Sequence, residues 1–190
     1  MPVSQINSNS LATGVPAKAN LPTGSVLQVV QVSQNVRFLL NTSAAKINEA
    51  NLTTSQTNSK ILAILSCAIG GNNAYADHDL GLAIGYKTGS ASSTSTDYTA
   101  VHYQGYSRQV VAGLGSFYAN DTTRSGDGSI YWTEEKTYLK LISPNQSSGT
   151  NIYVSFWGST DGTYYLGSPS GSTETDGGSE MSLTLLEIAG

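Results

Sequence analysis

Hydrophobic and polar residues alternate along most of this chain in short segments, which clusters of Gly, Asn, Asp and Ser separate. Such a pattern is typical of β-strands in an antiparallel sandwich or barrel. In the clearest segment, Ile152, Val154 and Phe156 fall on one face and polar or mixed residues on the other. The pattern predicts strands over residues 25–33, 46–54, 60–70, 80–86, 98–103, 109–118, 130–132, 137–143, 151–157, 163–166 and 181–188.

Two of the predicted strands are apolar on both faces. Segment 61–69 carries Ile, Ala, Leu and Cys at its odd positions, and Leu62, Ile64 and Ala68 lie opposite. In 181–188, Leu183 and Leu185 oppose Leu186 and Ile188. A second sheet covers one face of such a strand, and a subunit partner is a natural cover for the other. The sequence therefore predicts an oligomer.

Residues 35–51 leave two interpretations open. A helix would place Val36, Leu39, Leu40 and Ile47 roughly on one stripe, whereas the polar cluster 41–43 and the β-branched neighbours favour extended structure. The Asp161-Gly162 pair, which supplies positive φ angles, predicts a hairpin turn over 159–162 between Trp157 and Tyr164.

The first 23 residues form a segment of a different kind. They hold three prolines, one charge and no periodic apolar pattern, so we interpret 1–23 as an extended N-terminal arm that precedes a single domain over 24–190. The arm is either an anchor on another surface or a free terminus. Its candidate anchoring side chains are Val3, Ile6, Leu11, Val15 and Leu21.

Composition narrows the classes of function. A formal charge of −4 supplies no basic surface for phosphates, so no nucleic acid partner is expected. No apolar run of about 18 residues is present, which predicts no membrane span, and the N-terminus lacks the pattern of a secretory signal, which predicts synthesis in the cytoplasm. The single cysteine, Cys67, excludes an intramolecular disulfide and is expected to be a buried, inert residue.

Groups that bear chemistry are sparse. Asp77-His78-Asp79 places neighbouring ligands on opposite sides, His102 is remote, and 121–128 lacks the alternating Asp residues of a calcium loop. The carboxylates of Glu174, Asp176 and Glu180 lie in a loop without an apolar pocket to raise a pKa. No enzyme activity, metal or cofactor is predicted.

The aromatic residues are unevenly distributed, because all 11 Tyr and both Trp lie between Tyr75 and Tyr165. Exposed Tyr beside Asn and Ser is typical of binding surfaces, and ordinary cross-strand pairing is the alternative role. The candidates for contact with a glycan, all next to turn signals, are Tyr103, Tyr106, Tyr118, Tyr164 and Tyr165.

Four segments together resemble a family of virion proteins from tailed bacteriophages, most strongly those of marine bacteria and cyanobacteria, where such modules occur in head and tail-fibre proteins. They are Gly24-Ser-Val-Leu-Gln-Val-Val30, Ser59-Lys-Ile-Leu-Ala-Ile-Leu65, Ser143-Pro-Asn-Gln-Ser-Ser-Gly-Thr-Asn-Ile-Tyr-Val154 and Ser182-Leu-Thr-Leu-Leu-Glu-Ile-Ala-Gly190. The resemblance covers 24–190 and is weaker over 75–128. It implies a jelly-roll β-sandwich similar to tumour-necrosis-factor-like heads, with the first and last strands paired near a trimer axis.

The expected function is that of a non-enzymatic virion surface protein, a homotrimeric capsid decoration (cement) or head-fibre protein that its arm attaches to the major capsid protein or another virion protein. The residues expected along the core and trimer seam are Val26, Leu27, Val29, Val30, Leu183, Leu185 and Ile188. The alternative is a tail-fibre, receptor-binding module that recognises host surface polysaccharide through its Tyr-rich loops. A hydrolase acting on that glycan is the third possibility, and it lacks a carboxylate pair.

Overall fold

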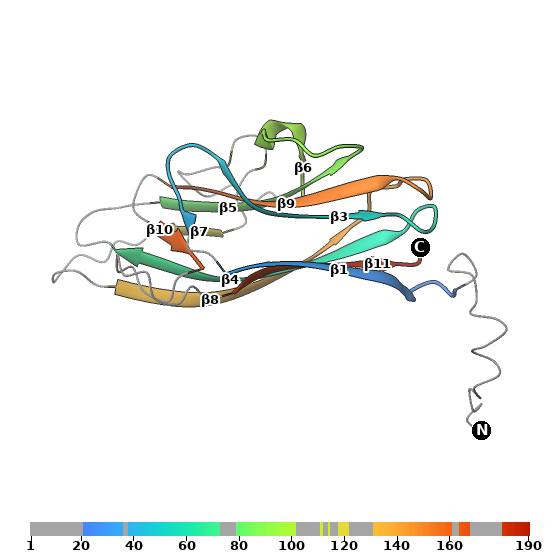
Figure 1. The fold of residues 1–190 in the computed structure, drawn as a ribbon, viewed down its shortest axis with the longest axis horizontal. Helices are drawn as coiled ribbons and strands as arrows, with labels where there is room; N and C mark the ends of the chain where they lie inside the picture. The colour runs from blue at the N-terminus through green and yellow to red at the C-terminus, as the bar shows by residue number, and fades with distance from the viewer. Residues whose placement is uncertain are drawn as a thin grey trace, which may run out of the picture.

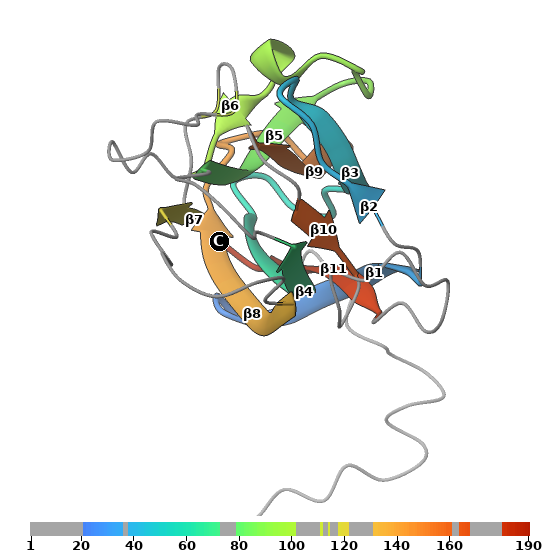
Figure 2. The same ribbon diagram turned by 90° about the vertical axis from the view of Figure 1, so that its left-hand side faces the viewer.

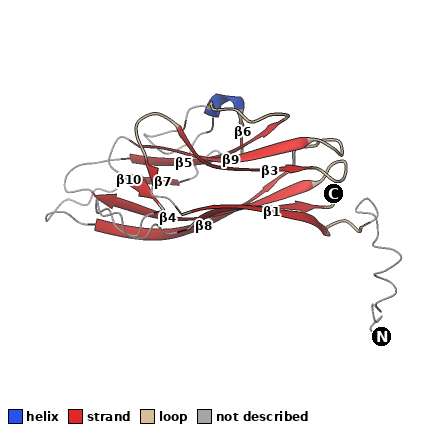
Figure 3. Cartoon of the chain, in the orientation of Figure 1, coloured by secondary structure: helices blue, strands red, loops and turns tan. Residues whose placement is uncertain are grey.

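The computed structural model describes residues 21–35, 38–72, 79–101, 111, 114, 118–121, 131–160, 164–167 and 180–190. In this part of the chain the protein is all-β and consists of two antiparallel sheets stacked face to face (Figures 1 and 3). Within the same residues, the 3-10 turn η2 (Ser95–Asp97) is the one helical segment. The expected all-β sandwich is confirmed.

Sheet A is built around β4 (Lys60–Asn72). One edge of β4 pairs with β8 (Tyr131–Ile142), and its other edge pairs first with β11 (Met181–Ile188) and then with β10 (Tyr164–Leu166). The outer positions belong to β1 (Val26–Gln34), which pairs with β11, and to β2 (Phe38–Leu39), which pairs with β10. Across most of its length the sheet therefore has the order β1, β11, β4, β8.

Sheet B has β9 (Asn151–Thr160) between β3 (Ala45–Thr53) and β5 (Asp79–Thr88). The far edge of β5 pairs with the short strands β6 (Thr99–Ala100) and β7 (Tyr118–Asp121). The end view in Figure 2 shows the two sheets as separate layers, with β3, β5 and β9 in one and β1, β4 and β8 in the other.

The core lies between the two layers and is filled by the inward-facing residues of both sheets. Strand β11 alternates strictly, with Met181, Leu183 and Leu185 fully buried and their neighbours half-buried, as a period of two requires. The largest fully buried side chains are Trp157, Phe156, Leu40, Ile61, Leu65, Ile69, Leu80, Leu82, Leu114, Ile152 and Leu166.

Side-chain amides join the two sheets along the side where β1 and β3 lie. Gln28 donates from Nε2 to the backbone oxygen of Thr53 at 2.6 Å, and Asn48 donates from Nδ2 to the backbone oxygen of Val32 at 3.3 Å. Both strands contain a register shift here, between Val26 and Gln28 and between residues 46 and 48. Such irregularities change which face a side chain takes. Leu27 is therefore buried, although Val29, Gln31 and Ser33, which follow it at steps of two, are exposed.

The two ends of the described chain meet at one end of the sandwich. The backbone N–H of Gly24 donates to the oxygen of Ala189 at 3.0 Å, and the Thr23 hydroxyl donates to the oxygen of Gly190 at 2.9 Å. Strands β7 and β10 lie at the opposite end (Figure 1). The molecule therefore has a terminal end, which includes Leu21 and Gly190, and a distal end.

Several details of the strand predictions are wrong. Residues 130–132 and 137–143 were expected to form two strands, but β8 runs unbroken through Glu134, Glu135 and Lys136 because each of them pairs with β4. The predicted hairpin over 159–162 is also wrong, since β9 continues to Thr160 in sheet B while β10 belongs to sheet A. In 35–51, the described residues contain β2 and the start of β3, so the extended interpretation holds there.

Candidate assembly interface

The outer face of sheet A, which faces away from the core, carries side chains that are apolar at the terminal end. One row of directly paired residues crosses all four strands and consists of Val29, Leu186, Leu62 and Leu141. We call it the apolar row. Just beyond it toward the terminal end, a further row contains Val26, Ile188 and the exposed Lys60.

The next rows become more polar toward the distal end. The mixed row contains Gln31, Thr184, Ile64 and Leu139. The row after it, the hydroxyl row, contains only Ser33, Ser182, Ser66 and Thr137. These three rows hold no charged residue, so the face changes from apolar to neutral polar along the strands.

The apolar side chains of this face are open to solvent. Val26 is 50% exposed, Val29 59%, Leu139 62% and Leu141 49%. Most exposed apolar residues in proteins are scattered singly, whereas these gather with half-buried Leu62, Ile64, Leu186 and Ile188 into one patch. A contiguous apolar patch of this kind marks an interaction surface. We call these eight residues the apolar face.

The outer face of sheet B is covered by the chain itself. A flap, made of residues 88–101 with Val111 and Leu114, packs over it and forms a second small core with Ala83 and Trp157. Tyr98 of the flap meets Trp157 edge to face, with ring centroids 5.6 Å apart. Of the two outer faces, only that of sheet A presents its apolar side chains to solvent within the described residues.

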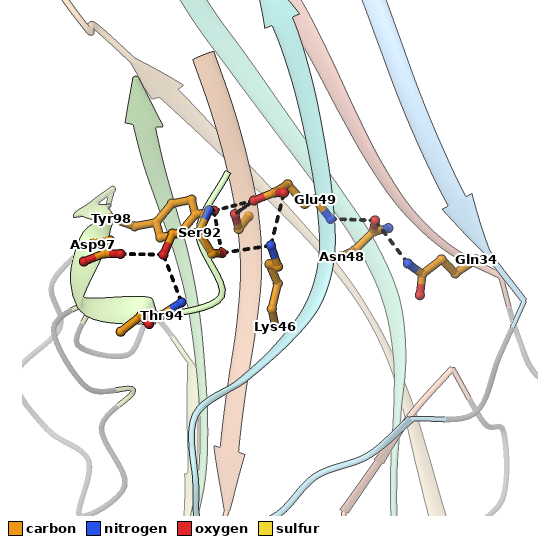
Figure 4. A network of polar contacts seen from close by, with 9 residues as sticks. Gln34, Lys46, Asn48, Glu49, Ser92, Thr94, Asp97 and Tyr98 are labelled. Carbon is orange, nitrogen blue, oxygen red and sulfur yellow. Dashed lines mark hydrogen bonds and ion pairs between the residues drawn. The ribbon is translucent and has the colours of Figure 1, made fainter. Parts of the chain in front are cut away.

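A polar network holds the flap against sheet B (Figure 4). At its centre, the Glu49 carboxylate accepts hydrogen bonds from the hydroxyls of Tyr98 and Ser155 and from Nζ of Lys46 at 3.1 Å. Lys46 also donates to the backbone oxygen of Ser92 at 2.9 Å. The network thus joins β3 and β9 to Ser92 and Tyr98 of the flap.

The electrostatics of this network fit a structural clamp. Burial raises the pKa of the Glu49 carboxyl. Hydrogen bonds from Ser155, Tyr98 and Lys46, together with the charge of Lys46, lower it by a larger amount, so the net pKa lies below its ordinary value. Ser155 is fully buried and Tyr98 nearly so. Tyr98 thus binds the flap to Glu49 directly, and Lys46 binds both Glu49 and Ser92 of the flap.

The seven residues expected along the core and seam separate into two groups. Val26 and Val29 are exposed, and Ile188 is half-buried on the apolar face. Leu27, Leu183 and Leu185 are buried, and the half-buried Val30 packs against the core. The core and the proposed seam thus use alternate residues of the same strands.

Sequence reasoning missed the contribution of β8 to this face. Leu139 and Leu141 alternate with Tyr138 and Lys140, so the sequence shows the period of two. That Leu141 lies beside Leu62, and Leu139 beside Ile64, follows only from the pairing of β8 with β4.

Other predicted site residues lie mostly outside the described residues. Of the five candidate anchoring side chains, Leu21 lies within the described residues, and it is half-buried at the terminal end. Tyr118 begins β7, and Tyr164 and Tyr165 are in β10, so the structure puts these three strand positions at the distal end. Residues outside the description include Val3, Ile6, Leu11, Val15, Tyr103, Tyr106, His78, His102, Glu174 and Asp176.

Cys67 lies on the core side of β4 and is buried. Burial raises the pKa of its thiol to about 12, which keeps the sulfur protonated and unreactive at neutral pH. Among the described residues, no three His, Cys, Asp or Glu side chains come together as metal ligands do. The described part of the chain also contains no helix of the length and apolarity needed to cross a membrane.

No family model and no curated protein matches this chain.

Proposed function

We propose that this protein is a non-enzymatic structural protein of a phage virion surface, a homotrimeric capsid decoration or head-fibre protein that works by binding. The observation that carries the proposal is the apolar face of sheet A, which is solvent-exposed in a single chain while sheet B is covered by its own flap. A second copy of the chain that covers the face removes this apolar surface from water.

The strand order supports a jelly-roll sandwich. If β1 and β2, β10 and β11, and β6 and β7 are each counted as one interrupted strand, sheet A contains the first, last, third and sixth strands in order. Sheet B contains the second, seventh, fourth and fifth. Two sheets of four antiparallel strands joined in this way are the arrangement of a jelly roll.

The test is a charge placed on the apolar face. Leu139→Glu changes a side chain that is 62% exposed, so the single chain should fold normally, but the carboxylate would be buried without a partner on assembly. The substituted protein should be a monomer by light scattering. The matched control is Thr137→Glu in the same strand and on the same face, within the hydroxyl row, and it should assemble more readily than Leu139→Glu. A trimeric mass for Leu139→Glu would contradict the proposed interface.

The proposed attachment through the arm is tested separately. Because the arm joins the sandwich at the terminal end, beside Gly190, its removal leaves the described strands intact. Deletion of residues 1–23 should abolish incorporation into particles while the sandwich still folds. Normal incorporation of the truncated protein would refute the anchor.

A receptor-binding module for host polysaccharide is the second candidate function. It is supported by the position of Tyr118, Tyr164 and Tyr165 in strands at the distal end, far from the proposed attachment. Binding to isolated host glycans that is lost on Tyr→Ala substitution at these positions would favour it. Failure to bind any envelope fraction would count against it.

A further inference from the structure

We propose that the flap covers a binding site for one neutral oxygen atom, that of a water molecule or of a small alcohol, between Trp157 and Ser159 of β9. The site lies on the outer face of sheet B. It is therefore separate from the apolar face of sheet A and does not depend on the proposed assembly.

Two buried polar groups on β9 have no hydrogen-bond partner among the described residues. They are Nε1 of Trp157 and the hydroxyl of Ser159, and the two residues are 1% and 2% exposed. Proteins leave few buried polar groups without a partner, and an ordered water molecule commonly supplies the missing bonds. Two such groups close together point to a ligand that binds both.

The two side chains are neighbours on one face of the sheet. Trp157 pairs with Ala83 and Ser159 pairs with Gly81 in an unbroken register, so the two residues share the outer face. Two steps along a strand measure about 6.6 Å. An oxygen atom with two hydrogen bonds of about 2.9 Å spans up to about 5.8 Å, which suits one atom that contacts both groups.

Strand β5 presents the smallest side chains beside these groups. Gly81, opposite Ser159, has no side chain, and Ala83, opposite Trp157, has a single methyl group. Both positions are buried, so the chain covers this part of the sheet. No side chain of β5 larger than a methyl group therefore takes up the space beside the two polar groups.

The surroundings select a neutral oxygen atom. The indole of Trp157 only donates, so the ligand must accept there, whereas the hydroxyl of Ser159 donates or accepts. The small core under the flap contains no charged residue within the described part of the chain, and an ion would be buried there without a counter-charge. The Tyr98 hydroxyl of the flap already donates to Glu49. Water or an alcohol hydroxyl meets these requirements.

Removal of one hydroxyl tests the site through the direction of its effect. If Ser159 binds the oxygen, Ser159→Ala should lower the urea midpoint of unfolding, because the ligand loses a partner. If the hydroxyl has no partner, its removal leaves the midpoint unchanged or raises it, and that result would overturn the proposal. The matched control is Ser155→Ala in the same strand. Its fully buried hydroxyl donates to Glu49 at 2.7 Å, so this substitution should lower the midpoint.

Crystal structures of the full chain identify the ligand. Crystals grown without alcohol should show an isolated oxygen peak within about 3.2 Å of both Nε1 of Trp157 and Oγ of Ser159, as a water molecule gives. After a soak in ethylene glycol, continuous density in place of the peak would assign an alcohol as a second ligand, and an unchanged peak would assign the site to water. Absence of a peak from both crystals, or a protein group bonded to both side chains, would overturn the proposal.

Discussion

Glu187 shows how one residue fastens the terminal end of the sandwich. Its carboxylate is fully buried and accepts hydrogen bonds from Nε2 of Gln28 at 2.6 Å and from the backbone N–H groups of Ser55 and Gln56 at 2.6 and 3.3 Å. One acidic side chain thereby joins β1, β11 and the loop that follows β3. A buried charge is tolerated because its oxygens are surrounded by donors.

Replacing Glu187 by Gln should therefore destabilise the fold. The amide has one acceptor oxygen instead of two, and its NH₂ group faces backbone donors, so we expect a loss of about 2–3 kcal/mol in the free energy of unfolding. Urea denaturation followed by circular dichroism measures it. The matched control, Glu180→Gln, changes an exposed carboxylate and should stay within about 0.5 kcal/mol of the native protein. Equal stability of the two variants would contradict this role of the Glu187 carboxylate.

The same carboxylates make stability depend on pH. For Glu187, burial raises the pKa, but hydrogen bonds from Ser59, Ser55 and Gln28 lower it more, and the net pKa of both Glu187 and Glu49 lies below the ordinary 4.5. The folded state thus binds these protons less tightly than the unfolded state. Their contribution is complete above pH 4.5 and is lost as the pH falls through the lowered pKa values.

Urea unfolding at pH 7 and at successively lower pH should show that decline, and Glu187→Gln should show a smaller one. A native protein that gains stability on acidification would contradict the assignment of lowered pKa values.

Gly85 lets the flap approach sheet B. A Cβ atom at this position would lie 2.7 Å from Cδ2 of Leu114 and 2.8 Å from Cβ of Tyr98. Gly85→Ala should therefore push the flap outward and cost about 1–3 kcal/mol. Trp157, buried under the flap, reports the change, and its fluorescence should shift to the red in a Trp132→Phe background. Unchanged stability and emission would show that the flap does not pack on Gly85.

At the scale of elements, the sequence predicts strands best where the burial pattern is local. The predicted bounds of 181–188 agree with β11 because its two faces differ at every step. The charged residues Glu134 to Lys136 interrupt the apolar alternation of β8, a strand at the edge of sheet A, so the sequence predicts two short strands where the structure has one. Charges on an edge strand are common because they discourage uncontrolled pairing.

The Asp161-Gly162 signal fails for a related reason. Asp-Gly favours a reversal of the chain, and a hairpin follows only if the flanking strands pair with each other. Here β9 pairs with β3 and β5, while β10 pairs with β4 and β2. Choice of sheet is settled by packing across the whole domain, which a local turn signal does not contain.

The candidate interface could likewise be predicted only in part. The doubly apolar segments 61–69 and 181–188 predict that β4 and β11 need a cover on both faces, and the structure places Leu62 and Leu186 side by side on the outer one. Their continuation into β8 depends on long-range pairing. So does the cover of sheet B, because Gly85, Tyr98 and Leu114 meet only in the folded chain.

At the scale of the whole molecule, the two outer faces differ, because the flap covers that of sheet B while that of sheet A presents apolar side chains to solvent. In the proposed assembly, sheet A would lie between copies and the flap of sheet B would face outward. The proposed attachment would use the terminal end, where Thr23 and Gly190 meet, and β7 and β10 lie at the opposite end.

The solution mass of the purified protein tests the central claim most directly. Light scattering at micromolar concentration should give about three times the 19.9 kDa of one chain, both for the full chain and after deletion of residues 1–23, because the apolar face lies entirely within the sandwich. A mass of one chain in both samples would contradict assembly through sheet A.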